Sequence, residues 1–159
     1  MLRISKLTDY GTVVLACLAS PPGRRHTATA VATRTRLGLP TVSKLLKSFH
    51  HAGLVTSVRG AHGGYELARP AHEISAASII DAIEGPVAIT ECSSDHSACD
   101  LENVCSTGGS WQRINEAIRR SLDGISLAQL SGQEAVAQWR PELGGAFGRV
   151  PSTRAGERN

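Results

Sequence analysis

The sequence lacks any long apolar run. Its 159 residues contain no apolar stretch that reaches the length of about 18 residues typical of a transmembrane helix. The N-terminal residues also lack the charged region, apolar region and small-residue cleavage site of a secretory signal peptide. We therefore expect a cytoplasmic protein without a membrane partner.

Aromatic residues and enzyme motifs are scarce as well. Only 4% of the residues are aromatic, so the predicted core is mainly aliphatic. We find no nucleotide-binding glycine fingerprint, no Ser/His/Asp order and no pair of catalytic carboxylates. These absences argue against an enzyme, and we predict none.

Acidic residues are nearly missing from the first part of the chain. Residues 1–70 contain ten Lys and Arg but only two acids, Asp9 and Glu66, which gives a net charge of +8. Residues 71–159 contain seven basic and twelve acidic residues, a net charge of −5. A basic part joined to an acidic part indicates a polyanion-binding module followed by a part with another task, although charge alone is also compatible with an ordinary surface.

The first 70 residues have the pattern of a winged helix-turn-helix. Apolar residues at helical spacing predict a first helix over residues 7–19, in which Cys17 is a buried thiol, and residues 27–35 predict a short second helix capped by Thr27. Residues 40–52 predict a third helix, whose apolar stripe follows an i, i+3, i+4, i+7 pattern: Val42, Leu45, Leu46 and Phe49. Residues 54–59 and 65–68 predict two short strands joined by a glycine-rich turn. The predicted fold is mainly α with a small β-hairpin wing.

The polar face of the third predicted helix supplies candidates for DNA recognition. Thr41 and Ser43 suit base edges or phosphates, and Lys44 and Lys47 suit phosphates or guanine. Any amphipathic helix has a polar outer face, so this pattern alone does not establish a DNA contact. The adjacent hairpin favours one, because it is basic and rich in glycine. We expect Arg59 to reach the minor groove and the wing residues Gly60 and His62 to lie along the DNA.

The second half of the chain predicts further helices and a cysteine-bearing loop. Ser75 is a candidate cap for a helix that ends at Gly85. From about Ser110 to Gly124, a long helix has one apolar edge: Trp111, Ile114, Ile118 and Leu122. We divide the chain into a DNA-binding domain (1–70), a connecting helix and cysteine loop (71–109), a long helix with a short following helix (110–131) and a flexible tail (132–159).

Three of the four cysteines, Cys92, Cys99 and Cys105, lie within fourteen positions. In a reducing compartment, such a group favours a metal site over a disulfide framework. Thiolates are soft ligands that hold iron–sulfur clusters. Structural zinc is a second interpretation, against which the gaps of six and five residues argue because zinc knuckles are tighter. A redox switch that uses only thiols is a third.

Three segments resemble one bacterial family. They are Leu7-Thr8-Asp9-Tyr10, Leu39-Pro40-Thr41-Val42-Ser43-Lys44, and the wing sequence from Gly53 to Tyr65 with Arg59-Gly60-Ala61-His62-Gly63-Gly64. The family contains the iron–sulfur cluster regulators (IscR), the nitric-oxide-sensitive repressors (NsrR) and the regulators of the SUF cluster-assembly operon. The resemblance covers residues 2–130 and is greatest to the SUF-operon regulators.

This resemblance implies a homodimer that binds palindromic double-stranded operator DNA. The long helix around residues 111–122 would cross between subunits, although its apolar edge also fits a contact within one chain. Cys92, Cys99 and Cys105 would hold a 2Fe–2S or 4Fe–4S cluster, received from the iron–sulfur assembly machinery. The implied function is a repressor that senses cluster status and controls cluster-assembly genes, with thiol-based or nitric-oxide sensing as the alternative within the family.

The fourth ligand is less clearly indicated. The first cysteine gap is one residue longer than the family's usual gap, and Gly108 stands where IscR-type members have a histidine. Asp9 matches the aspartate that NsrR-type members offer from the partner subunit, and we prefer it. His96, inside the cysteine segment, is the rival. Asp9 also fits a local role, since an acid in the first turn of a helix is stabilised by the helix dipole.

Overall fold

The computed structural model describes residues 4–60, 62–90 and 107–134. It contains α1 (Lys6–Ala19), α2 (Ala28–Thr35), α3 (Leu39–His51), β1 (Val55–Val58), β2 (Gly64–Leu67), the 3₁₀ turn η1 (Ala71–Glu73), α4 (Ala76–Glu84), α5 (Gly108–Asp123) and α6 (Leu127–Leu130). This order confirms the predicted mainly α fold with a β-hairpin wing. In the described residues, no helix is long and apolar enough to cross a membrane.

Hydroxyl caps determine where several helices begin. Ser5, Thr27, Ser75 and Ser126 each accept a hydrogen bond from the backbone N–H three residues further on, at the start of α1, α2, α4 and α6. Such caps satisfy amides that have no partner within the helix. Thr27 and Ser75 were predicted as caps. Several boundaries differ from prediction by one or two residues: for example, Leu39 already belongs to α3 and Gly108 to α5.

The core is formed mainly by aliphatic side chains, as the composition predicts. Phe49 is its largest fully buried residue. Around it lie buried residues of α1, α2, α3, β1, α4 and α6, together with Leu54 before β1 and Ile74 before α4. The full set is Val14, Leu15, Leu18, Val31, Val42, Leu45, Leu46, Leu54, Val55, Ile74, Ile79 and Leu127. Residues before and after position 70 therefore share one core.

Gly11 allows the closest packing in this core. A Cβ atom at this position would lie 2.5 Å from Cδ1 of Ile83 and 2.8 Å from Cζ of Phe49. Only glycine lets α1 pack so closely against α3 and α4 without displacing those side chains. The predicted first helix is thus held tightly against both the third helix and the helix that leads to the cysteine segment.

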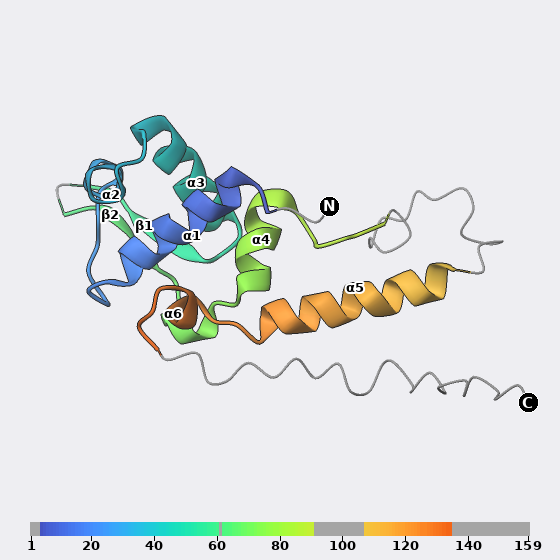
Figure 1. The fold of residues 1–159 in the computed structure, drawn as a ribbon. Helices are drawn as coiled ribbons and strands as arrows, with labels where there is room; N and C mark the ends of the chain where they lie inside the picture. Colours follow the sequence, from blue (N-terminus) through green and yellow to red (C-terminus); the bar gives the residue numbers. More distant parts are fainter. Residues whose placement is uncertain (1–3, 61, 91–106, 135–159) are drawn as a thin grey trace, which may run out of the picture.

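The long helix α5 differs from the others, because none of its residues is buried. Figure 1 shows it projecting away from the body formed by α1–α4. Trp111 on its predicted apolar edge is 41% exposed, and Ile114, Ile118 and Leu122 are half-buried. The contact of this edge with the body of its own chain is thus incomplete.

Candidate nucleic-acid interface

The third helix has one face fixed in the core and one face turned to solvent. Gly38 caps its start and Pro40 lies in its first turn, where a missing N–H costs little. At the other end, Gly53 has φ +71°, the left-handed conformation that ends helices. The predicted apolar stripe is fully buried, and α3 packs on α1 and α2. The opposite face is therefore presented outward in a fixed orientation.

The outward face of α3 carries the predicted DNA-contacting residues. Ser43, Lys44 and Lys47 are exposed, and Thr41 is half-buried. Within the described residues, neither lysine forms an ion pair with a carboxylate. Their ammonium groups are consequently uncommitted, which suits contacts with phosphate oxygens.

The hairpin β1–β2 forms the wing beside this helix. Its strands are antiparallel, with Val55 opposite Leu67 and Val58 opposite Gly64. In the turn, the N–H of Gly63 donates to the carbonyl oxygen of Gly60 at 2.9 Å. Arg59, Gly60 and His62 are exposed on the turn, as predicted for a wing.

Glycine is required in this turn for steric reasons. Gly60 has φ +110°, which L side chains rarely adopt. A Cβ atom on Gly63 would lie only 2.4 Å from the carbonyl oxygen of Val58 and 2.9 Å from that of Gly60. The tight turn thereby places Arg59 at a defined position at the tip of the wing.

The wing is attached to the loop between α1 and α2. The N–H of His26 donates to the oxygen of Tyr65 at 2.9 Å, and the N–H of Tyr65 donates back at 2.8 Å. Next to this bridge, Arg25 forms a 3.2 Å ion pair with Glu66. These contacts, which sequence reasoning missed, fix the direction of the wing relative to the helices.

The ring of His26 is buried and held next to a cation. It is 6% exposed, and the guanidinium of Arg34 lies 3.5 Å from Nδ1 while also donating to the oxygen of Ser20 at 3.0 Å. Burial lowers the pKa of His26, and the charges of Arg34 and Arg24 lower it further. A neutral imidazole is therefore favoured at this junction.

The thiol of Cys17 in α1 was predicted to be buried, but it is only half-buried in the structure. Its partial burial raises the pKa of the thiol.

Asp9, the proposed fourth ligand, lies in the first turn of α1 and is exposed. Cys92, Cys99, Cys105 and the rival His96 lie outside the described residues. Within the described part, no three His, Cys, Asp or Glu side chains are grouped as a metal site, and no ion pair engages Asp9. Within the described residues, Asp9 is thus an exposed carboxylate without an ion pair, and a carboxylate of this kind is available as a metal ligand.

Asp9 also lines a mainly apolar groove of about 470 Å³ between α1, α4, the end of α5 and α6. Its apolar lining residues include Ile4, Ile79, Ile80, Leu122 and Leu130. Ile4 and Leu130 are 62% and 46% exposed. The proposed ligand thus borders an apolar surface that is open in the single chain.

A second contact that sequence reasoning missed involves Glu84, at the end of α4. Its Oε1 accepts hydrogen bonds from the N–H of Ser5, at 3.2 Å, and from the hydroxyl of Thr8. These bonds lower the pKa of Glu84. A signal was present in the sequence, because an acid in the last turn of a helix opposes the helix dipole and so indicates a partner elsewhere.

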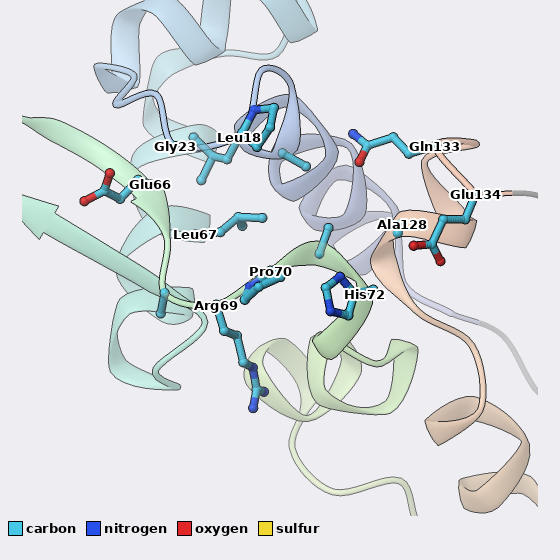
Figure 2. A pocket seen from close by; sticks show the side chains of 14 residues that line it. Leu18, Gly23, Glu66, Leu67, Arg69, Pro70, His72, Ala128, Gln133 and Glu134 are labelled. Carbon is cyan, nitrogen blue, oxygen red and sulfur yellow. The ribbon is translucent and has the colours of Figure 1, made fainter.

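A different hollow of about 570 Å³ lies between the end of α1, the end of β2, η1 and α6. Figure 2 shows that its polar side chains do not converge, since Glu66 and Glu134 lie at opposite sides and Arg69 points away from both. Convergent polar groups are what orient a small ligand in its site. The described side chains around this hollow therefore lack the convergence of a small-ligand site.

Comparison with known proteins identifies relatives of this chain. A family model described as "Rrf2: Iron-dependent Transcriptional regulator" matches residues 4–133. The chain is 30% identical over 130 residues to "Protein rrf2" of Nitratidesulfovibrio vulgaris, covering 81% of this chain and 87% of that protein. It is 31% identical over 131 residues to the HTH-type transcriptional regulator CymR of Bacillus subtilis, covering 82% and 90%.

Solved structures show the same similarity. The structure of CymR, the global cysteine regulator of B. subtilis, has a TM-score of 0.65 at 29% identity, covering 84% of this chain and 99% of that chain. The structure of T. potens IscR has a TM-score of 0.62 at 30% identity, covering 87% and 93%. The fold with its wing is therefore that of helix-turn-helix transcriptional regulators.

Proposed function

The chain belongs to the Rrf2 family of transcriptional regulators, and on that premise we propose that it is an operator-binding repressor controlled by an iron–sulfur cluster. Its relatives are transcriptional regulators and not enzymes. The observation that carries the proposal is the outward face of α3, where Lys44 and Lys47 stand uncommitted beside a wing of fixed direction. Cys92, Cys99 and Cys105 are the reason to propose control by a cluster, because their thiolates are potential iron ligands.

The proposed DNA contacts follow from the position of each side chain. Thr41 and Ser43 lie in the first half of α3, the part of a recognition helix that meets base edges. Lys44 and Lys47 neutralise phosphates. Arg59 reaches into the minor groove, and Gly60 and His62 allow the wing to lie close to the backbone. We also propose that residues 1–70 bind the DNA, whereas the cluster and the dimer contact involve residues after position 70.

We propose that the active form is a homodimer. The apolar edge of α5, including Trp111, is incompletely covered by its own chain, and the groove beside Asp9 is open. Apolar surface of this kind is stabilised by burial against a second copy. A dimer would also let one subunit supply Asp9 to the cysteine group of the other.

Cys92, Cys99 and Cys105 would hold the cluster, with Asp9 as the fourth ligand and His96 as its rival. A carboxylate ligand is harder and more weakly bound to iron than a thiolate, so this side of the site is the labile one. The bound group would supply sensitivity to oxidants and to iron supply. In the proposed cytoplasmic setting, the assembly machinery would donate the cluster, and cluster-assembly genes would be the targets.

The test is purification without oxygen, followed by visible absorption, iron and sulfide analysis, and operator binding before and after cluster removal. The probe is the DNA upstream of the protein's own gene, with scrambled DNA as a control. We expect a coloured dimer whose affinity for that DNA changes on cluster loss, and a colourless Cys92→Ser variant that no longer responds. A colourless wild type with unchanged specific binding would refute cluster sensing and leave the thiol switch. Zinc in place of iron would identify a structural site.

A further inference from the structure

The cap at the start of α1 is completed by a residue from the end of α4. In a capping box, the hydroxyl of the N-cap residue accepts from the third helical residue, whose own side chain accepts from the N-cap N–H. Here Ser5 accepts from the N–H of Thr8 at 3.2 Å. Thr8 has no carboxylate to return the bond, and Glu84 supplies it instead by accepting from the N–H of Ser5 at 3.2 Å.

This contact is well defined on the α1 side. Thr8 is 2% exposed, and its hydroxyl also donates to Glu84. Buried hydroxyls require a partner, because an unsatisfied one is costly. Glu84 itself ends α4, next to Gly85 with φ +88°. A carboxylate there is unfavourable for α4 but favourable at the positive end of α1.

Residues 85–90, here named the lead-in segment, connect α4 to the cysteine segment. They are also fastened on the α5 side, because the side-chain amide of Asn115 donates to the oxygen of Val87 at 3.0 Å. One turn further along α5, Arg119 forms a 2.7 Å ion pair with Asp81 of α4. The chain that leads to Cys92 is therefore fastened to α5 through Val87 and, through Glu84 immediately before the segment, to α1.

We infer that Glu84 is a positioning residue that couples the lead-in segment to the first helix of the DNA-binding module by completing the cap of α1. The inference rests on the proposed function for its regulatory meaning, though not for the contact itself. A displacement of the lead-in segment would withdraw Glu84 from Ser5 and Thr8. The N–H of Ser5 would then lose its acceptor, and the cap of α1 would keep only the bond from the N–H of Thr8 to the Ser5 hydroxyl. Since α1 packs on α3, the change would reach the DNA-contacting face.

The test compares Glu84→Ala, Glu84→Gln and Thr8→Val with the matched control Glu73→Ala, which removes an exposed carboxylate from η1. For each full-length protein, the affinity for DNA upstream of the gene is measured with and without the cluster. Allosteric ratios are typically about 5- to 150-fold. We expect Glu84→Ala and Thr8→Val to bring the ratio close to one without changing the visible spectrum. Glu84→Gln, which keeps an acceptor oxygen, should retain most of the ratio.

Hydrogen exchange in the cluster-free proteins gives a readout that does not depend on the cluster. If the coupling exists, Glu84→Ala accelerates exchange in residues 5–9 and in residues 87–90 together, whereas Glu73→Ala accelerates neither. An unchanged affinity ratio in Glu84→Ala, or faster exchange in only one of the two segments, would overturn the inference. If the wild type shows no cluster response, the proposed function fails, and the exchange data alone decide about the coupling.

Discussion

His26 and Tyr65 exchange two backbone hydrogen bonds, with N···O distances of 2.9 and 2.8 Å, and so join the loop after α1 to the wing. The pair makes the position of the wing depend on a short segment between two helices. Because the His26 ring is buried next to Arg34, the junction also contains a group whose charge state matters.

The lowered pKa of His26 predicts a specific pH dependence of stability. The unfolded chain binds a proton near the ordinary histidine pKa of about 6.5, whereas the folded chain does so only at lower pH. Stability is therefore full above that value and decreases as the pH falls towards the folded pKa. Urea unfolding between pH 7.5 and 5.5 should show a weaker decrease for His26→Gln than for wild type. The exposed His51→Gln serves as a control, and equal decreases in all three proteins would contradict the assignment.

Gly63→Ala should damage the wing without unfolding the protein. The new Cβ atom would lie 2.4 Å from the Val58 oxygen, so the turn must move. Backbone strain of this kind costs about 1–3 kcal/mol. If the unbound wing relieves this strain by moving and the DNA-bound wing cannot, operator affinity falls roughly 5- to 150-fold. Fluorescence anisotropy with operator DNA measures this, together with a circular dichroism melt. Gly109→Ala, where nothing lies within 4 Å of the new atom, should bind normally; similar affinities for both variants would remove the wing from the interface.

Lys44→Ala and Lys47→Ala should each reduce the salt dependence of operator binding. A phosphate contact releases about 0.9 counterions, so each substitution should lower the slope of log K against log salt by about one. Titrations at several salt concentrations measure the slope. Arg120→Ala is the control, because this exposed residue lies on α5 and pairs with Glu116. A lysine whose removal leaves the slope at the wild-type value does not contact phosphate.

Asp9→Ala and His96→Ala distinguish the two candidate fourth ligands. If Asp9 is the ligand, its removal should shift the visible absorption of the anaerobic protein and accelerate cluster loss in air, whereas His96→Ala should behave as wild type. The reverse pattern would assign the site to His96. Because Asp9 is proposed to come from the partner subunit, mixed dimers of Asp9→Ala and Cys92→Ser chains should recover one intact site, detected as half the wild-type iron content.

Much of the fold could be predicted because local signals agreed with tertiary packing. The stripe of Val42, Leu45, Leu46 and Phe49 repeats at helical spacing and is fully buried. Thr27 and Ser75 were recognisable as caps because short hydroxyl side chains precede apolar helical segments. The wing followed from two short strands with glycines between them, and the structure adds the steric reason at Gly63.

The remaining contacts join residues that are far apart in the sequence. Glu84 and Ser5 are separated by 79 positions, and no periodic pattern connects them. The bridge from His26 to Tyr65 uses backbone atoms, which are the same in every residue type. Glu84 lies at the C-terminal end of α4, where a carboxylate is unfavourable for the helix dipole. This position was a usable signal in the sequence, but it indicates only that Glu84 has a partner and not which residue the partner is.

The core shared across position 70 has a consequence for building hybrid regulators. Ile74, Ile79 and Leu127 are packed in the same core as Phe49. A chimera that joins residues 1–70 to the sensor half of a relative would replace these side chains, and Glu84, with the residues that the relative has at those positions. Exchange of promoter specificity between relatives should instead graft only the exposed residues of α3 and the wing tip onto an intact chain. In this architecture, the surface can be exchanged in small pieces, whereas the two parts that share the core have to be exchanged together.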